Sequence, residues 1–332
     1  MRDFHALIDA VQHNCHITDA RHARSMTMCA YLLEMQQYYR WENGIPYSAS
    51  LPKGEVGNWL VEREKLWSEF EDLPYSPLRI GGEIDPFDSM AVNRLIVPEG
   101  YVYGAGYGRF GKPHFFLGRL SRKEVRGDYT ILVSDCEYAR DLVAPTAAFQ
   151  HETIFLRRDA VKRMVWEGLW KKRGDAAHCH DASTPDAALE AATERECEAV
   201  ILHEMGEGMA GEMLGRGWEA MVSDAASIKT EVIVRAVRDL LADCLSTLPG
   251  LIKRGEECSL HFYFENLSGM RRELFPLAVE AYRAWCAAGD HGPLFEAIEN
   301  GSEHWLGVGR NLLEKYEVDG NLLLENAEEF RL

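Results

Sequence analysis

The chain has 332 residues, of which 46% are hydrophobic and 27% are charged, proportions that are ordinary for a soluble globular protein. Its 53 acidic and 36 basic residues give a formal net charge of −17, which repels phosphate backbones and makes nucleic acid a poor partner. A metal ion, or a small neutral or cationic molecule, is easier to reconcile with this charge.

The eight cysteines are scattered and form no CxxC motif, a usage that favours a reducing cytoplasm. The N-terminal residues carry charges and histidines throughout and lack the apolar segment of an export signal. No stretch approaches the roughly 20 apolar residues of a membrane-spanning helix. We therefore expect a cytoplasmic protein that does not enter a membrane, and nothing in the sequence sets its oligomeric state.

Helical spacing of apolar residues dominates both ends of the chain. At the N-terminal end this spacing predicts helices over residues 3–18, 20–44 and 54–73. Gly44, followed by Pro46, supplies a stop signal after the second of them. Residues 74–148 are instead rich in Gly, Tyr, Val and Phe with frequent turn signals, which predicts short antiparallel strands. Helical spacing returns from residue 149.

These patterns predict a mainly α protein, in which a helical bundle carries a small antiparallel β-rich insertion, α+β overall. We expect N-terminal helices over 1–73, a β-rich subdomain over 74–148 and a C-terminal helical region over 149–332. The two helical parts are expected to pack together as one core.

The stretch "ILHEMGEGMAGEML", residues 201–214, places a polar pair inside an apolar helix. His203 and Glu207 are four residues apart and therefore share one helix face. Their neighbours on that face are mostly small or apolar, and burying an imidazole and a carboxylate without a partner costs several kcal/mol. A divalent ion is one possible partner, and a structural hydrogen bond between the two side chains is the alternative.

A second stretch, "LHFYFENLSGMRREL", repeats this pattern with His261 and Glu265. A His nitrogen and a carboxylate oxygen from each of two helices make a four-ligand set that suits iron or manganese, and less well zinc. We predict a divalent transition-metal site formed by His203, Glu207, His261 and Glu265. The zinc-protease motif HExxH is not met, because Glu207 stands where its second His is required.

Three N-terminal residues are candidate ligands of a second ion. Asp19 and His22 have the carboxylate-x-x-His spacing of helical di-metal sites, and Glu34 is an acid among Leu and Met. They would join the first four ligands if the helices met around one cavity. The structural alternative is an N-terminal helix with exposed histidines.

The glycine-rich segment "GYGRFG" matches GxGxxG, but the segment after it reads as a strand and not as a helix. We interpret it as a hairpin with glycine kinks. A phosphate-ester enzyme that uses this hairpin with Arg157 and Arg158 is a weaker hypothesis.

Together these features favour a metal-dependent enzyme that acts on a small molecule, with iron or manganese redox chemistry slightly preferred over metal-assisted hydrolysis. Candidate substrate-binding residues are Arg158, Tyr38 and Tyr103. The alternative is a non-catalytic binding or regulatory protein that works through the basic amphipathic helix 154–173 and the aromatic β-region.

Overall fold

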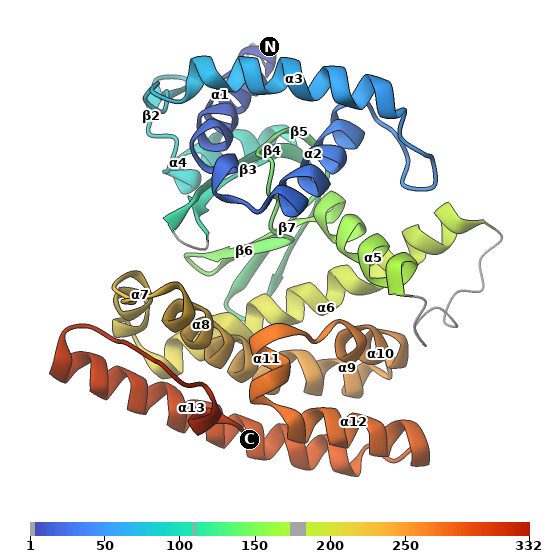
Figure 1. Ribbon diagram of the computed structural model, residues 1–332, viewed down its shortest axis with the longest axis vertical. Helices are drawn as coiled ribbons and strands as arrows, with labels where there is room; N and C mark the ends of the chain where they lie inside the picture. The colour runs from blue at the N-terminus through green and yellow to red at the C-terminus, as the bar shows by residue number, and fades with distance from the viewer. Residues whose placement is uncertain (1–3, 109–110, 173–183) are drawn as a thin grey trace.

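The structure, a computed structural model, describes residues 4–108, 111–172 and 184–332. In Figure 1 the main sheet lies between the N-terminal and the C-terminal helices. The helices before residue 157 are α1 (Phe4–His22), α2 (Met28–Glu42), α3 (Lys53–Phe70) and α4 (Ser89–Ile96). The strands are β1 (Leu78–Arg79), β2 (Glu83–Ile84), β3 (Tyr101–Tyr107), β4 (Pro113–Arg126), β5 (Tyr129–Arg140), β6 (Ala147–Gln150) and β7 (Thr153–Arg157).

The larger sheet has five strands in the order β3-β4-β5-β7-β6, and β1 and β2 form a separate pair. Neighbouring strands are antiparallel, except that β5 and β7 are parallel. Strand β7 lies between β5 and β6. The register between β4 and β5 shifts near Leu117 and again near Leu120. Such irregularities bend a strand and increase its twist, and the sheet curls into a half-barrel (Figure 1).

The predicted fold class is wrong about the role of this sheet. The β-region is not a small antiparallel insertion in a helical bundle, because the five-stranded sheet makes the protein a substantial α+β structure. The error arises partly at "TIFLR", residues 153–157, which form β7 although the sequence pattern places them in the N-terminal part of the following helix. All five residues are buried, and a short buried apolar run has no periodicity that separates a strand from a helix.

A second difference lies just before β3. The segment "NRLIV" reads as a strand, yet most of it belongs to α4. The Asp88 carboxylate accepts a hydrogen bond from the Ala91 N–H at 2.9 Å and so caps this helix. The cap and the burial of Val92 and Ile96 stabilise a helix where the sequence suggests a strand.

Helix α1 packs on the sheet. Leu7, Val11 and Cys15 of α1 are buried together with Tyr103 and Phe115 of the strands. Among the described residues, the large hydrophobic cluster of the C-terminal helices contains none from 1–73. Helix α1 thus shares a hydrophobic core with the sheet, while Tyr47 packs against Trp166 of the C-terminal half.

The second half of the chain is helical. Its elements are α5 (Arg158–Lys172), α6 (Pro185–Leu214), α7 (Gly217–Ser223), α8 (Ile228–Ala242), the π-helical segment η5 (Asp243–Thr247), α9 (Leu248–Arg254), α10 (Glu257–Asn266), α11 (Gly269–Leu274), α12 (Pro276–Ala288) and α13 (Gly292–Asp319). Trp218, Leu240, Phe275 and Trp305 are fully or almost fully buried within this helical part. None of the described helices combines the length and the apolar character needed to cross a bilayer.

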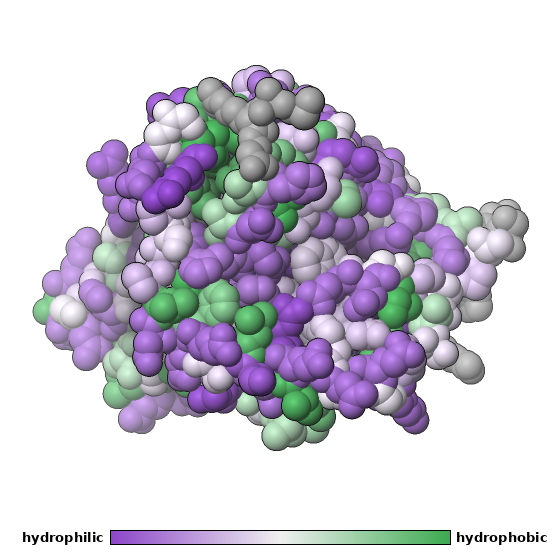
Figure 2. Space-filling model, turned by 90° about the horizontal axis from the view of Figure 1, so that it is seen from above, coloured by the Kyte–Doolittle hydropathy of each residue, from purple (hydrophilic) through white to green (hydrophobic). Residues whose placement is uncertain are grey.

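Charged and polar residues cover much of the surface. On the face seen from above in Figure 2, hydrophilic residues dominate and hydrophobic ones form separate small areas. This distribution is consistent with the large negative net charge of the chain.

A glycine brings the two helices of the candidate site together. A Cβ atom at Gly206 of α6 would lie 2.3 Å from the carbonyl oxygen of Ala242, the last residue of α8. Only glycine permits this approach, because the obstacle is backbone and cannot rotate away. The approach places the face of α6 that carries His203 and Glu207 against the C-terminal end of α8.

We predict that Gly206→Ala lowers the free energy of unfolding by about 1–3 kcal/mol, the usual cost of forcing an added group into a packed interior. Gly211 is the matched control, because it lies in the same helix and a Cβ there meets no atom within 4 Å. Gly211→Ala should stabilise the protein by up to about 1 kcal/mol, since alanine favours a helix. Urea unfolding of both variants tests this, and equal effects would contradict the close contact.

Candidate metal centre

The candidate centre forms where α6, α8 and η5 meet. His203 and Glu207 lie one turn apart on α6, and Asp239 lies near the end of α8. Asp243 follows four residues later, as the first residue of η5. The helix widens into a π turn there, shortly before Pro249, a residue that removes a backbone donor and crowds the preceding turn.

Three side chains can reach a single ion. One potential ligand atom from each of His203, Glu207 and Asp239 lies within 4.8 Å of the other two. His203 Nε2 is 3.7 Å from Glu207 Oε1. One imidazole nitrogen and two carboxylates are thus gathered around a common point, a set suited to a divalent transition metal.

The other imidazole nitrogen is held by Asp243. His203 Nδ1 donates to Asp243 Oδ1 at 2.8 Å, which directs Nε2 toward the other two carboxylates. Metal-binding histidines commonly donate their second nitrogen to a carboxylate in this way, because the bond fixes the ring and raises its basicity. Asp243 also accepts hydrogen bonds from Tyr263 Oη at 2.7 Å, Thr247 Oγ1 at 3.0 Å and Arg271 Nη1 at 3.2 Å.

The pKa values of these groups depend on one another. Burial alone would lower the pKa of His203, but the charge and hydrogen bond of Asp243 raise it to about 10. Burial would raise the pKa of Asp243, but Arg271 and His203 lower it below its usual value. In Glu207 the attraction of Arg238 and His203 outweighs burial and lowers the pKa, whereas burial and the Glu207 charge raise the pKa of Asp239.

Glu204 is a further acid beside this centre. Burial, followed by repulsion from Glu207, raises the pKa of Glu204 to about 8. It is therefore largely protonated at neutral pH and adds little charge. Arg238 donates to Glu207 Oε2 at 3.1 Å and also pairs with Glu219 at 2.7 Å, so a cation already lies on one side of the centre.

A cavity of about 460 Å³ opens beside the centre, with His203 and Asp239 in its wall. Glu231, Arg235 and Arg271 also line it. Its volume is in the range of small-molecule sites. A bound ion would therefore lie next to a space that admits a small substrate.

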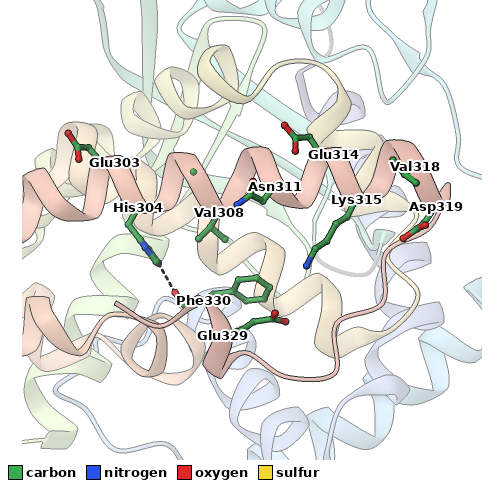
Figure 3. A pocket seen from close by; sticks show the side chains of 11 residues that line it. Glu303, His304, Val308, Asn311, Glu314, Lys315, Val318, Asp319, Glu329 and Phe330 are labelled. Carbon is green, nitrogen blue, oxygen red and sulfur yellow. Dashed lines mark hydrogen bonds between the residues drawn. The ribbon is translucent and has the colours of Figure 1, made fainter.

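Figure 3 shows a larger cavity, of about 760 Å³, between α13 and the C-terminal segment. Its histidine, His304, donates from Nε2 to the carbonyl oxygen of Phe330 at 2.7 Å, which ties the C-terminal segment to α13. Among the described residues, the His, Cys, Asp and Glu side chains at mutual ligand distance are those of the His203 group. The smaller cavity is therefore the better candidate for chemistry.

The structure separates the two predicted His–Glu couples. His261 Nδ1 lies 2.8 Å from Tyr282 Oη, and its ring packs on Trp285 at 4.8 Å between centroids. Tyr263, two residues further along α10, is the side chain that reaches Asp243. Two residues correspond to about 200° around a helix, so His261 and, one turn later, Glu265 point away from the centre. The third member of the ligand group is Asp239, and not His261 or Glu265 as the sequence predicts.

The N-terminal candidates do not form a second ligand group within the described residues. Both carboxylate oxygens of Asp19 accept the Leu142 N–H, at 2.9 and 3.0 Å, in a fully buried position. Burial and the Lys112 charge lower the pKa of His22. Glu34 forms two 2.6 Å hydrogen bonds with Arg163 of α5.

The predicted substrate-binding residues lie outside the cavity beside His203. Arg158 pairs with Glu190 of α6 at 2.7 Å. Tyr38 is buried and accepts a hydrogen bond from Gln12 at 2.9 Å, and buried Tyr103 donates to the Pro86 carbonyl oxygen at 2.6 Å. Each of the three side chains has a structural partner, which explains its position without a ligand.

Asp239 and Asp243 are the site residues that the sequence analysis missed. They belong to "VRDLLADCL", in which two acids stand four residues apart in an apolar helix. The same spacing drew attention to His203 and Glu207. An acidic pair without a histidine is a weaker signal, because exposed acids at this spacing are common on helices.

Replacing the partner of His203 should change its titration. In Asp243→Asn we expect the pKa of His203 to fall from about 10 toward or below 6.5, since the attraction that opposes burial is lost. Because the folded state raises the pKa of His203, the protonated imidazole stabilises the fold in the wild type. This contribution is complete below pH 6.5 and is lost as the pH rises through about 10. Histidine NMR titration measures the shift.

Asp141→Asn is the matched control, because Asp141 holds another imidazole, that of His114, at 2.7 Å. It should leave the titration of His203 unchanged. A pKa of His203 that stays near 10 in Asp243→Asn would contradict the assigned hydrogen bond.

Asp19 should make stability depend on pH in the N-terminal half. Burial raises its pKa from 3.8 to about 8, only partly opposed by Lys112. The neutral acid thus stabilises the fold at low pH, and this contribution disappears as the pH rises from about 4 through 8, by up to about 1.4 kcal/mol per pH unit. Relative to Asp19→Asn, the wild type should therefore lose stability between pH 5 and pH 8 in urea unfolding. Asp9→Asn, at an exposed position of the same helix, should show no such divergence.

Two family models match the chain. One describes the N-terminal domain of a family of unknown function, DUF6866, and matches residues 6–157, and the other describes its C-terminal domain and matches residues 158–330. Their border falls between β7 and α5, so the whole candidate centre lies in the C-terminal domain. Comparison with curated proteins and with solved structures gives no match. The chain belongs to the DUF6866 family.

Proposed function

We propose that this protein is a metal-dependent enzyme whose C-terminal domain binds one divalent ion through His203, Glu207 and Asp239. The observation that supports it is the convergence of these three ligand atoms within 4.8 Å, with Asp243 bonded to the rear nitrogen of the imidazole. The adjoining cavity provides room for a small-molecule substrate.

Iron or manganese fits this ligand set better than zinc. Two carboxylates and one imidazole form a comparatively hard site, whereas structural zinc sites favour thiolates and several imidazoles. Three protein ligands leave positions open, and such an ion supplies redox chemistry or, alternatively, activates water for hydrolysis. We favour the redox reaction, and place the protein in the cytoplasm, where iron and manganese meet a reducing environment.

The alternative, a non-catalytic protein that works through the basic helix, has less support. Arg158 and Lys162 of α5 both pair with Glu190, and Arg163 pairs with Glu34. These intramolecular pairs already neutralise much of the positive charge that would attract an acidic partner.

Metal binding is the direct test. Untagged protein titrated with Mn²⁺, and anaerobically with Fe²⁺, should bind one ion per chain by calorimetry and elemental analysis. His203→Ala and Asp239→Asn should each weaken binding by about 100-fold or more, because each removes a ligand. Circular dichroism confirms that the variants are folded.

Glu265→Gln is the control for sequence pattern, because Glu265 follows a histidine by four residues but lies outside the ligand group. It should bind Mn²⁺ as the wild type does. If the wild type binds no stoichiometric ion, or if all three variants bind equally well, the proposal fails.

A further inference from the structure

Two arginines line the cavity beside the proposed ion. Arg235 comes from α8, one turn before Asp239, and Arg271 comes from α11. Helix α8 contacts α11 (Figure 1), so the two guanidinium groups enter one cavity from different elements. Side chains with permanent positive charge are unusual in the wall of a cation site, and they require a separate explanation.

Each arginine is held by one carboxylate. Arg235 Nε donates to Glu231 Oε1 at 2.8 Å, and Arg271 Nη1 donates to Asp243 Oδ2 at 3.2 Å. Each of these bonds uses one of the five N–H donors of a guanidinium group. The side chains remain 25% and 29% exposed, so further donors are accessible from the cavity. Such fixed donors suit carboxylate and phosphate oxygens.

An ion at the proposed centre would add positive charge to the wall of this cavity. It would lie among the carboxylates of Glu207, Asp239 and Asp243, beside the arginines that line the cavity. A divalent cation next to Arg235 and Arg271 attracts an anion although the whole chain is acidic.

We propose that the substrate of this cavity is a small oxyanion, whose carboxylate or phosphoryl oxygens bind Arg235 and Arg271 while its reacting part lies beside the ion. This inference rests on the proposed metal-dependent function. The cavity volume of about 460 Å³ suits a small molecule.

Calorimetric titration of the Mn²⁺-loaded protein with inorganic phosphate, and separately with malonate, tests the inference. Phosphate or malonate should bind at least 10-fold more tightly with Mn²⁺ than without it. The tighter of the two identifies whether a phosphoryl or a carboxylate group is preferred. Arg235→Gln should reduce that affinity at least 10-fold while the affinity for Mn²⁺ changes by less than about 3-fold.

Arg272→Gln is the matched control, because Arg272 neighbours Arg271 on α11 but donates to the Leu267 carbonyl oxygen. It should bind both Mn²⁺ and the oxyanion as the wild type does. If Mn²⁺ binds but neither anion does, or if Arg235→Gln binds the anion normally, the inference is overturned and the metal site stands. If Mn²⁺ itself does not bind, both proposals fail.

Discussion

The buried carboxylate of Asp243 is the interaction on which the polar centre of the C-terminal domain depends. Its side chain is almost fully buried, and an ionised acid in such a place is tolerated only when hydrogen bonds and opposite charge replace water. Donors from α6, η5, α10 and α11 do so. One carboxylate of η5 thereby links this segment to three other helices, α6, α10 and α11, and sets the direction of the His203 ring.

The same arrangement can hold His203 in two states. As an imidazolium it is attracted to the carboxylates around it, and in the proposed metal site it would bind the ion as a neutral ligand, with its proton released. The same carboxylates that pair with the imidazolium are those that the proposal assigns to the ion or to the second imidazole nitrogen. The arginines around His203 offset the mutual repulsion of the carboxylates.

In the N-terminal half, a comparable cluster of buried charged residues has a structural role. Asp19, Asp141, Lys112 and His114 bring α1, the β3–β4 hairpin and the end of β5 together in a buried cluster. Asp19 resembles a metal ligand in the sequence because an acid and a histidine stand three residues apart. In the structure both of its oxygens accept the Leu142 N–H, the ammonium group of Lys112 lies 3.9 Å away, and no further ligand group gathers around it among the described residues. Residue type and spacing cannot distinguish a carboxylate that binds a cation from one that caps a backbone.

Sequence patterns alone predict the local features of this protein. Apolar spacing identifies most of the helices, and the four-residue spacing of His203 and Glu207 places them on one face of α6, since both follow from the geometry of a single helix. The tertiary structure decided the rest: the strand at 153–157, the approach at Gly206, and the choice of Asp239 and Asp243 over His261 and Glu265 as partners. Those outcomes depend on which helix faces meet and on which buried polar groups satisfy one another. They are determined by packing between distant segments, and the spacing of residues within one segment does not predict them.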